Sequence, residues 1–274
     1  MQRQILIIDD HNTLAEALDE VFTHSGHSVT VIEDREAALS VENIDDYDIV
    51  ITDLDVENYE ADPHHPNGNG KHDKCLPTVE ATHTHAGEHI KAFKICANGF
   101  RRDGFNEEEL KGLVATVLDY KIRFVDNIEY VRDLHENIEF ELPSALSLMH
   151  IVLDYLMKRV EKLGVVKAEQ SNLFVALDEA FVNAVKHGNK FDAAKNVRIT
   201  AEVSKHEARF TIEDEGEGFD VASIPDPLDP QNLFKTSGRG VLFIYNIMDE
   251  VKYNDRGNRL TMVKRSEENP AHRP

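Results

Sequence analysis

The stretch from Ala176 to Lys190, ALDEAFVNAVKHGNK, constrains the fold of this chain more than any other. Within it Glu179, Asn183 and His187 recur every four residues, which puts a carboxylate, an amide and an imidazole on one stripe of a helix. The opposite stripe is apolar and predicts that the helix docks on a core. Its members are Leu177, Ala180, Phe181, Ala184 and Val185. The polar stripe faces either a pocket or solvent, and spacing alone leaves both open.

Two pairs of glycines follow this helix in the sequence. Gly216 and Gly218 lie in DEGEGFD directly after a strand-like pattern, and they suit a tight turn in which the backbone approaches a ligand closely. Gly238 and Gly240 lie in SGRGV just before a helical pattern. A glycine loop that opens a helix can bind phosphate through its backbone N–H groups and the helix dipole.

In this order, the three motifs resemble the N, G1 and G2 boxes of the GHKL (Bergerat-fold) ATPases. Among these, the domain looks most like the anti-sigma-factor serine-protein kinases of bacterial partner-switching systems. The resemblance covers about residues 137 to 265. It implies an α+β Bergerat-fold sandwich that binds ATP with Mg²⁺ and transfers phosphate to a protein hydroxyl.

The resemblance also implies a role for single residues. Glu179 would be the catalytic base that takes the proton from the attacking hydroxyl, Asn183 would bind Mg²⁺, and Asp214 would accept a hydrogen bond from the adenine amino group. The remaining ATP-binding residues would be His187, Lys190, Gly216, Gly218, Gly238, Arg239, Gly240 and Thr261. Such a set fits phosphoryl transfer, in which positioning and charge neutralisation carry most of the catalysis.

The first 120 residues alternate short apolar runs with helical patterns. Ile5 to Ile8 predicts a buried strand that ends in two acids, and Tyr47 to Asp53 predicts another that ends in one. This alternation predicts an α/β fold with a doubly wound parallel sheet and right-handed crossovers. Acids at the carboxyl ends of its strands would then converge on one edge.

Asp9, Asp10 and Asp53 resemble the acidic pocket of response-regulator receiver domains. The resemblance implies that these acids bind Mg²⁺, that Asp53 accepts phosphate from an upstream histidine kinase or other phosphodonor, and that Thr82 is the switch hydroxyl. Residues 76 to 82 would form the fourth strand.

Two departures from the receiver pattern stand out. The position of the receiver lysine reads Asp103, and the proline that usually follows is Gly104. A bound metal or a constitutive binding surface is therefore the alternative to phosphorylation of Asp53. The segment EADPHHPNGNGKHDKC, between Asp53 and Leu76, is rich in glycine, proline, asparagine and histidine, which predicts a loop. Its histidine and cysteine spacings fit no structural zinc motif.

The predicted domain organisation is a receiver-like domain over 1–120, a linker helix over 121–136, the ATPase domain over 137–266 and a disordered tail over 267–274. Heptad-like spacing between Asn106 and Leu134 leaves two interpretations open. Either the last receiver helix ends near Tyr120, or one continuous helix leaves that domain and pairs with its copy in a homodimer.

Composition excludes several classes of function. A formal net charge of -21 disfavours direct binding to nucleic acid, and no apolar run approaches the roughly 20 residues of a membrane span. The first residues enter a strand pattern at once, so we expect no signal peptide. Only two cysteines occur, which argues against a disulfide scaffold and favours a cytoplasmic location.

The sequence thus predicts an ATP-dependent serine/threonine protein kinase that is regulated by a receiver-like domain. Its substrate would be a small antagonist protein, whose phosphorylation decides whether a sigma factor or another effector is released. The alternative is a nucleotide-dependent binding module that sequesters such a partner without phosphorylating it. Glu179 discriminates the two, because a module that only binds nucleotide needs no base.

Overall fold

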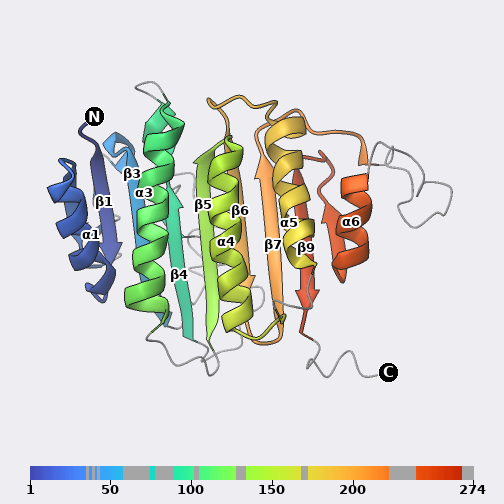
Figure 1. The fold of residues 1–274 in the computed structure, drawn as a ribbon, viewed down its shortest axis with the longest axis horizontal. Helices are drawn as coiled ribbons and strands as arrows, with labels where there is room; N and C mark the ends of the chain where they lie inside the picture. The colour runs from blue at the N-terminus through green and yellow to red at the C-terminus, as the bar shows by residue number, and fades with distance from the viewer. Residues whose placement is uncertain are drawn as a thin grey trace, which may run out of the picture. The chain divides into compact units, whose positions relative to one another are not determined.

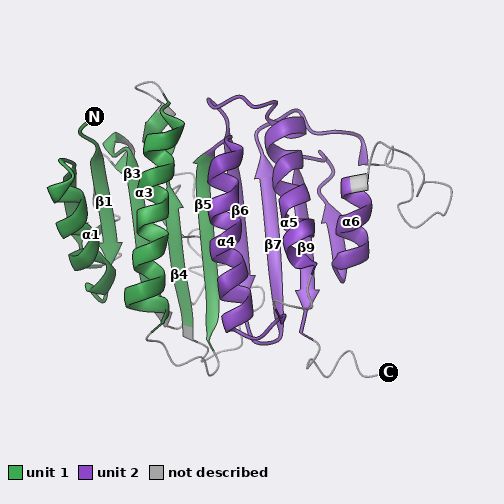
Figure 2. Cartoon of the chain, viewed as in Figure 1, with its two compact units in different colours: residues 1–142 green, residues 143–274 purple. Residues whose placement is uncertain are grey.

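The chain forms two compact units, Met1–Leu142 and Pro143–Pro274 (Figure 2). The computed structural model describes residues 1–34, 37–38, 41, 44–57, 75–77, 89–101, 105–127, 134–167, 172–221 and 239–266. The predictions for Thr82, Gly238 and the tail over 267–274 lie outside these residues. The units divide at Leu142, five residues after the predicted start of the ATPase domain. No helix in the described ranges is both long and apolar enough to cross a membrane.

The first unit contains a five-stranded mixed sheet in the order β2-β1-β3-β4-β5. Its strands are β1 (Gln4–Asp9), β2 (Ser28–Ile32), β3 (Ile49–Glu57), β4 (His89–Cys96) and β5 (His135–Pro143). Strand β1 pairs in parallel with both β2 and β3. The run Ile5 to Ile8 is completely buried, as expected for a strand covered on both faces. The first half of the predicted parallel sheet is therefore confirmed.

The second half differs, because β4 is antiparallel to β3. The pairing runs from Val50 opposite Cys96 to Glu57 opposite His89. Only β4 and β5 are again parallel. The prediction of a purely parallel, receiver-like sheet is thus wrong for this strand. A parallel neighbour requires a crossover that returns the chain to the starting end of the sheet, whereas an antiparallel neighbour does not.

Helical segments connect the strands of the first unit. They are α1 (Thr13–His24), η1 (Ile44–Asp46), η4 (Asn98–Arg101), α3 (Glu107–Tyr120) and η5 (Lys121–Asp126). The side chain of Asn106 caps α3 by accepting the backbone N–H of Glu109. The chain continues past Tyr120 as one π-helical segment, and β5 begins at His135. Residues 135 and 136, which the predicted linker helix over 121–136 includes, belong to β5 instead.

The second unit is a two-layer α+β structure (Figure 1). Its antiparallel sheet has the order β6-β7-β9-β8, formed by β6 (Asn196–Val203), β7 (Glu207–Asp214), β8 (Glu250–Tyr253) and β9 (Arg259–Arg265). One face is covered by α4 (Leu146–Lys162), α5 (Leu173–Val182), η7 (Asn183–Gly188) and α6 (Arg239–Ile247). Alternate residues of β7, including Ala208, Phe210 and Ile212, are buried beneath these helices. This arrangement agrees with the predicted ATPase sandwich.

Candidate functional site

The predicted helix over 176–190 is present, but it changes geometry halfway. Its apolar stripe is buried as predicted. Regular α-helix ends at Val182, and Asn183–Gly188 form a π-helical turn that closes with the N–H of Asn189 on the carbonyl of Ala184 at 2.8 Å. A π-turn contains more residues per turn than an α-helix and is frequent at functional sites. The strict four-residue stripe is therefore an approximation beyond Asn183.

Glu179 lies in the last turn of α5, and Asn183 is the first residue of η7. Both are half-buried, while His187 is exposed. Within the described residues, none of these three side chains has a hydrogen bond or ion pair to another side chain or to the backbone. Polar side chains that are half-buried and unpaired inside the protein remain available to an external ligand.

Helix α6 begins directly against the Glu179 carboxylate. A Cβ atom built on Gly240 would overlap Glu179 Oε2, so the start of α6 lies in close contact with this carboxylate. The N-terminus of α6 carries the positive end of the helix dipole. The predicted base and the predicted phosphate loop therefore meet at one point, with Asn183 one helical turn away.

A second contact of this kind joins η7 to the end of β7. A Cβ on Gly188 would overlap the Asp214 carboxylate, and one on Gly216 would overlap the carbonyl of Gly188. Asp214 Oδ1 accepts the backbone N–H of Gly216 at 2.8 Å. Burial raises the pKa of Asp214, and the Gly216 hydrogen bond and the nearby Arg256 charge oppose this rise. Asp214 is thus half-buried and in close contact with the backbone at Gly188 and Gly216.

The hairpin between β8 and β9 holds the glycine turn in place. Arg256 Nη2 donates to the carbonyl of Gly216 at 2.8 Å, and Gly218 adopts a φ of 77° against the carbonyl of Arg256. Asn258 accepts the backbone N–H of Asp214 through its carbonyl at 3.0 Å and donates its side-chain amide to the Asp214 carbonyl at 2.7 Å. Arg256 and Asn258 were not predicted from the sequence. The turn sequence RGN, directly before the last strand, was the only feature that could have indicated them.

Asn189 is a second residue that the sequence analysis missed. It is completely buried directly after the π-turn. Its amide donates to Ser144 Oγ at the start of α4 and to the carbonyl of Asn196 at the start of β6, both at 2.7 Å. Asn189 therefore fixes the end of η7 to two other elements. Its position beside Gly188 was visible in the sequence, but its partners lie 45 and 7 residues away.

Lys190 and Thr261 are placed less favourably than the other predicted binding residues. Lys190 is exposed and has a φ of 58°, as Phe191 has a φ of 59°. Thr261 pairs with Thr211 across the sheet, with 3.2 Å between the hydroxyls. Because Thr211 and Asp214 are three residues apart on one strand, their side chains leave opposite faces. This placement counts against a contact between Thr261 and a base held by Asp214.

The second unit also matches a known domain family. Residues 142–264 match the histidine kinase-like ATPase domain. The match contains the helix with Glu179 and Asn183, the turn at Asp214 and the loop before α6.

Curated relatives extend the similarity to whole proteins of this kind. The chain is 25% identical over 142 residues to the serine-protein kinase RsbW of Staphylococcus epidermidis, which covers 49% of this chain and 89% of the relative. It is 24% identical to RsbW of Oceanobacillus iheyensis over 48% of this chain and 87% of that protein. RsbW of Listeria innocua is 25% identical, with 48% and 88% covered.

The acids of the first unit are arranged very differently from those of the second unit. Asp9 is buried, and its Oδ2 accepts the backbone N–H groups of Leu14 and Ala15 at 2.8 Å each. It therefore caps the first turn of α1. Asp10 accepts the N–H of Asp55 at 2.8 Å, and burial raises its pKa. Both side chains are engaged in local structure.

Asp53 forms a buried ion pair with Lys121. The ammonium lies 2.8 Å and 3.0 Å from the two Asp53 oxygens and 3.4 Å from Asp126 Oδ1. Burial lowers the pKa of Lys121, but the charges of Asp53 and Asp126 outweigh it and raise the pKa overall. Burial also raises the pKa of Asp53, against the opposing effect of Lys121. At these distances we describe the pair as charged, with one cation shared by two carboxylates.

The position that corresponds to the receiver lysine in the sequence is Asp103. Lys121 contacts Asp53 instead, from the end of the last helix of the unit. Among the described residues, no group of three or more histidine, cysteine, aspartate or glutamate side chains is arranged to hold a metal ion. The geometry therefore gives no support to Mg²⁺ binding by Asp9, Asp10 and Asp53.

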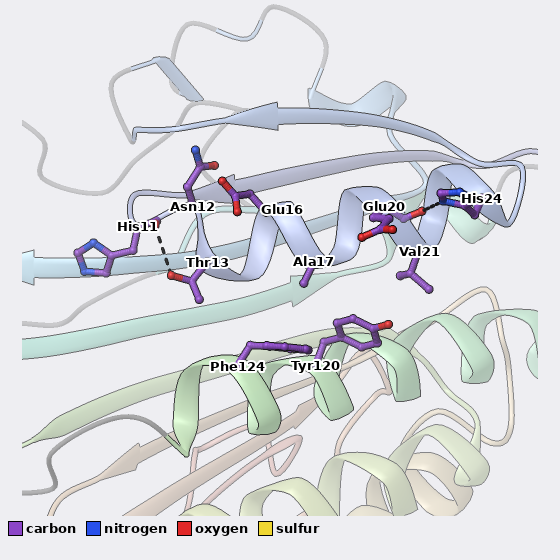
Figure 3. A pocket seen from close by; sticks show the side chains of 10 residues that line it. All are labelled: His11, Asn12, Thr13, Glu16, Ala17, Glu20, Val21, His24, Tyr120 and Phe124. Atoms are coloured by element: carbon purple, nitrogen blue, oxygen red, sulfur yellow. Dashed lines mark hydrogen bonds between the residues drawn. The ribbon is translucent and has the colours of Figure 1, made fainter.

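A groove of about 760 Å³ lies elsewhere in the first unit, between α1 and the end of α3 (Figure 3). Glu16 and Glu20 extend from α1 on one side, and the rings of Tyr120 and Phe124 lie on the other, 5.4 Å apart between centroids. None of the residues predicted to bind ATP, Mg²⁺ or phosphate lines it.

Proposed function

We propose that the second unit binds ATP with Mg²⁺ and transfers the terminal phosphoryl group to a serine or threonine hydroxyl of a protein partner. The observation that carries the proposal is the contact between Glu179 and Gly240 at the start of α6. It brings a half-buried carboxylate to the helix N-terminus where a phosphate would be held. The similarity of residues 142–264 to the histidine kinase-like ATPase domain supports ATP as the ligand.

The proposed binding roles follow from the chemistry of each group. Asp214 would accept a hydrogen bond from the adenine amino group next to Gly188 and Gly216. Gly218, with its φ of 77°, allows the turn that follows. The loop with Gly238, Arg239 and Gly240 would bind the phosphates, with His187 and Lys190 as neighbours of these phosphates.

Asn183 fits the proposed Mg²⁺ ion. Its amide oxygen is a hard donor next to the proposed phosphate position, and Mg²⁺ in such sites takes few protein ligands together with phosphate oxygens and water. When bound, the ion would neutralise phosphate charge. The protein would contribute orientation through Asn183 and a proton acceptor through Glu179.

Glu179 would remove the proton from the attacking hydroxyl as the new bond to phosphorus forms. The bond between the terminal phosphorus and its bridging oxygen would break, and the backbone N–H groups at the start of α6 would stabilise the charge on the phosphate oxygens. An antagonist protein would be the hydroxyl donor, in a partner switch that releases a sigma factor or another effector. The relatives named above are serine-protein kinases, which supports this substrate class.

The first unit would regulate this activity, and the full chain would act as a homodimer in the cytoplasm. The proposal does not include phosphorylation of Asp53, because Lys121 already binds both of its oxygens. A sequestering module that binds nucleotide without transfer is the second candidate. This module would require Asp214 to bind the adenine but would leave Glu179 without a role.

The test is to purify the full chain with its bound proteins, add Mg-ATP and map new phosphosites by mass spectrometry. Glu179→Gln is the matched control, because it keeps the shape of the side chain and removes the base. We expect serine or threonine phosphate on a co-purifying protein that is absent with the control. Binding of ATP without any phosphorylated protein would favour the sequestering module.

A further inference from the structure

The only two cysteines of the chain meet in the core of the first unit. Cys75 and Cys96 are 21 residues apart in sequence and are 3% and 1% exposed. Both are thiols, and their Sγ atoms lie 2.7 Å apart. They belong to one apolar cluster with Leu6, Val50 and Leu76. Chance alone does not commonly bring the only two thiols of 274 residues into contact.

Both positions are held by neighbouring groups. Cys96 ends β4, where it pairs with Val50 of β3 on one side and with Glu141 of β5 on the other. The carbonyl of Leu76, the residue after Cys75, accepts a hydrogen bond from Lys94 Nζ at 2.9 Å. Because Lys94 is itself on β4, the same strand fixes both thiols.

The surroundings of Cys96 contain groups that stabilise a thiolate. Asn98 Nδ2 lies 3.1 Å from Cys96 Sγ as a hydrogen-bond donor. The buried Lys94, which also pairs with Glu139 at 2.9 Å, adds positive charge. The contact with Cys75 and the burial act in the opposite direction and raise the pKa of Cys96 well above its ordinary value. Reaction with an oxidant is therefore expected to be slow.

We propose that Cys75 and Cys96 form a dithiol site that a small peroxide oxidises to an intramolecular disulfide. One thiolate attacks a peroxide oxygen and becomes a sulfenic acid as the first water leaves. The second thiol displaces the sulfenic oxygen as water and forms the S–S bond. In total, two thiols and one hydrogen peroxide give one disulfide and two waters. Peroxide suits the site because it is about as small as water, whereas a protein oxidant cannot reach buried sulfur.

The disulfide would attach the Cys75–Pro77 segment covalently to β4. This strand pairs with β3, which carries Asp53. The bond would restrict the unfolded chain, so it should raise the temperature of unfolding of the first unit. The site does not depend on the proposed kinase activity, and its test needs neither ATP nor a partner.

The experiment treats the reduced, folded full chain with hydrogen peroxide and then alkylates it under denaturing conditions without reductant. We expect the intact mass to fall by two hydrogens, both cysteines to resist alkylation until a reductant is added, and digestion to yield one peptide pair joined through Cys75 and Cys96. The mobility of the chain on a non-reducing gel should remain that of a single chain.

The controls are Cys75→Ser and Cys96→Ser, each of which should lose the mass change and form no joined peptide. If either variant does not fold, the peptide map of the wild-type chain decides alone. The proposal is overturned if the wild-type thiols remain fully alkylatable after peroxide treatment. It is equally overturned if the products are sulfinic acids or disulfides between two chains.

Discussion

The two units differ in whether a carboxylate that was predicted to be reactive has a cation beside it. In the first unit, Asp53 is 7% exposed and its charge is neutralised by Lys121. In the second, Glu179 is half-buried and has no cation beside it among the described residues. Both were selected from the sequence as reactive acids. The difference shows that a buried acid whose counter-charge is already present stabilises structure, whereas an acid without one can receive a ligand.

Glycine positions show the same difference between the units. In the second unit, Gly188 and Gly240 lie so close to a carboxylate that a Cβ atom on either would overlap it. In the first unit, the acids are reached by a lysine and by the backbone at the start of α1. Close approach by glycine backbone, in place of a cation, therefore distinguishes the candidate binding site from the structural ion pair.

The largest expected effect concerns the unpaired acid. Glu179→Gln should retain ATP binding and lower phosphoryl transfer by about 10²- to 10⁴-fold, the usual contribution of a general base. Asn183→Ala should lose Mg-dependent ATP binding itself. Titration with a fluorescent ATP analogue, alongside transfer rates, separates the two effects. Equal loss of nucleotide binding in both variants would contradict the assigned roles.

The paired acid should respond in stability. Lys121→Met removes the buried cation that contacts Asp53 and Asp126, and should lower the free energy of unfolding by about 3–5 kcal/mol. Lys111→Met, in α3 of the same unit, is the matched control. Lys111 forms only an exposed pair with Glu108 at 3.8 Å and should change stability by less than about 1 kcal/mol. Urea denaturation measures both.

The double variant Lys121→Met, Asp53→Leu should recover part of the lost stability, because it removes the buried Asp53 charge together with the lysine. If Lys121→Met alone proved as stable as the wild type, the ion pair would have no structural role. Asp53 would then be a reactive acid like Glu179, and the contrast between the two units would disappear.

A smaller expected effect tests the glycine contact. Gly240→Ala places a methyl group into the Glu179 carboxylate and should lower phosphoryl transfer about 10-fold or more by moving the base, with fold retained. Gly112→Ala in α3 is the control, since a Cβ there meets nothing within 4 Å. It should stabilise the helix by about 0.5–1 kcal/mol and leave transfer unchanged. Unaltered transfer in Gly240→Ala would mean that the position of the Glu179 base does not depend on its contact with the start of α6.

The smallest effect is on the pH dependence of stability. The pKa of Asp214 in the folded chain lies above the ordinary 3.8, so the folded state binds more protons than the unfolded state just above that pH. The contribution of Asp214 to stability is therefore present below pH 3.8 and decreases as the pH rises through the raised pKa. Asp214→Asn should remove this decrease and slightly raise the melting temperature at neutral pH.

The same variant should lose the rise in melting temperature that ATP produces in the wild type. A thermal shift assay with and without nucleotide at several pH values measures both changes. A melting temperature that falls at neutral pH in Asp214→Asn would mean that the carboxylate stabilises the fold, as Asp53 does, and is not held ready for a ligand.

Much of the second unit could be predicted from sequence because its determinants are local. The apolar stripe from Leu177 to Val185 and the glycine turn at Gly216 are encoded within a few residues. Their spacing alone predicted a docked helix and a close backbone approach. The π-turn after Asn183 was not predictable in this way, since it depends on contacts of Asn189 with Ser144 and Asn196.

Tertiary structure alone decided which acids are occupied and how the first sheet is completed. Lys121 is 68 residues from Asp53, and no local pattern connects them. The direction of β4 depends on which end of the sheet the chain reaches after Glu57, which hydrophobic periodicity does not record. Sequence determined the amphipathic helix, the glycine turns and the buried strands, because these follow from short-range sterics and side-chain alternation. Pairings between distant charges, strands and thiols required the folded chain.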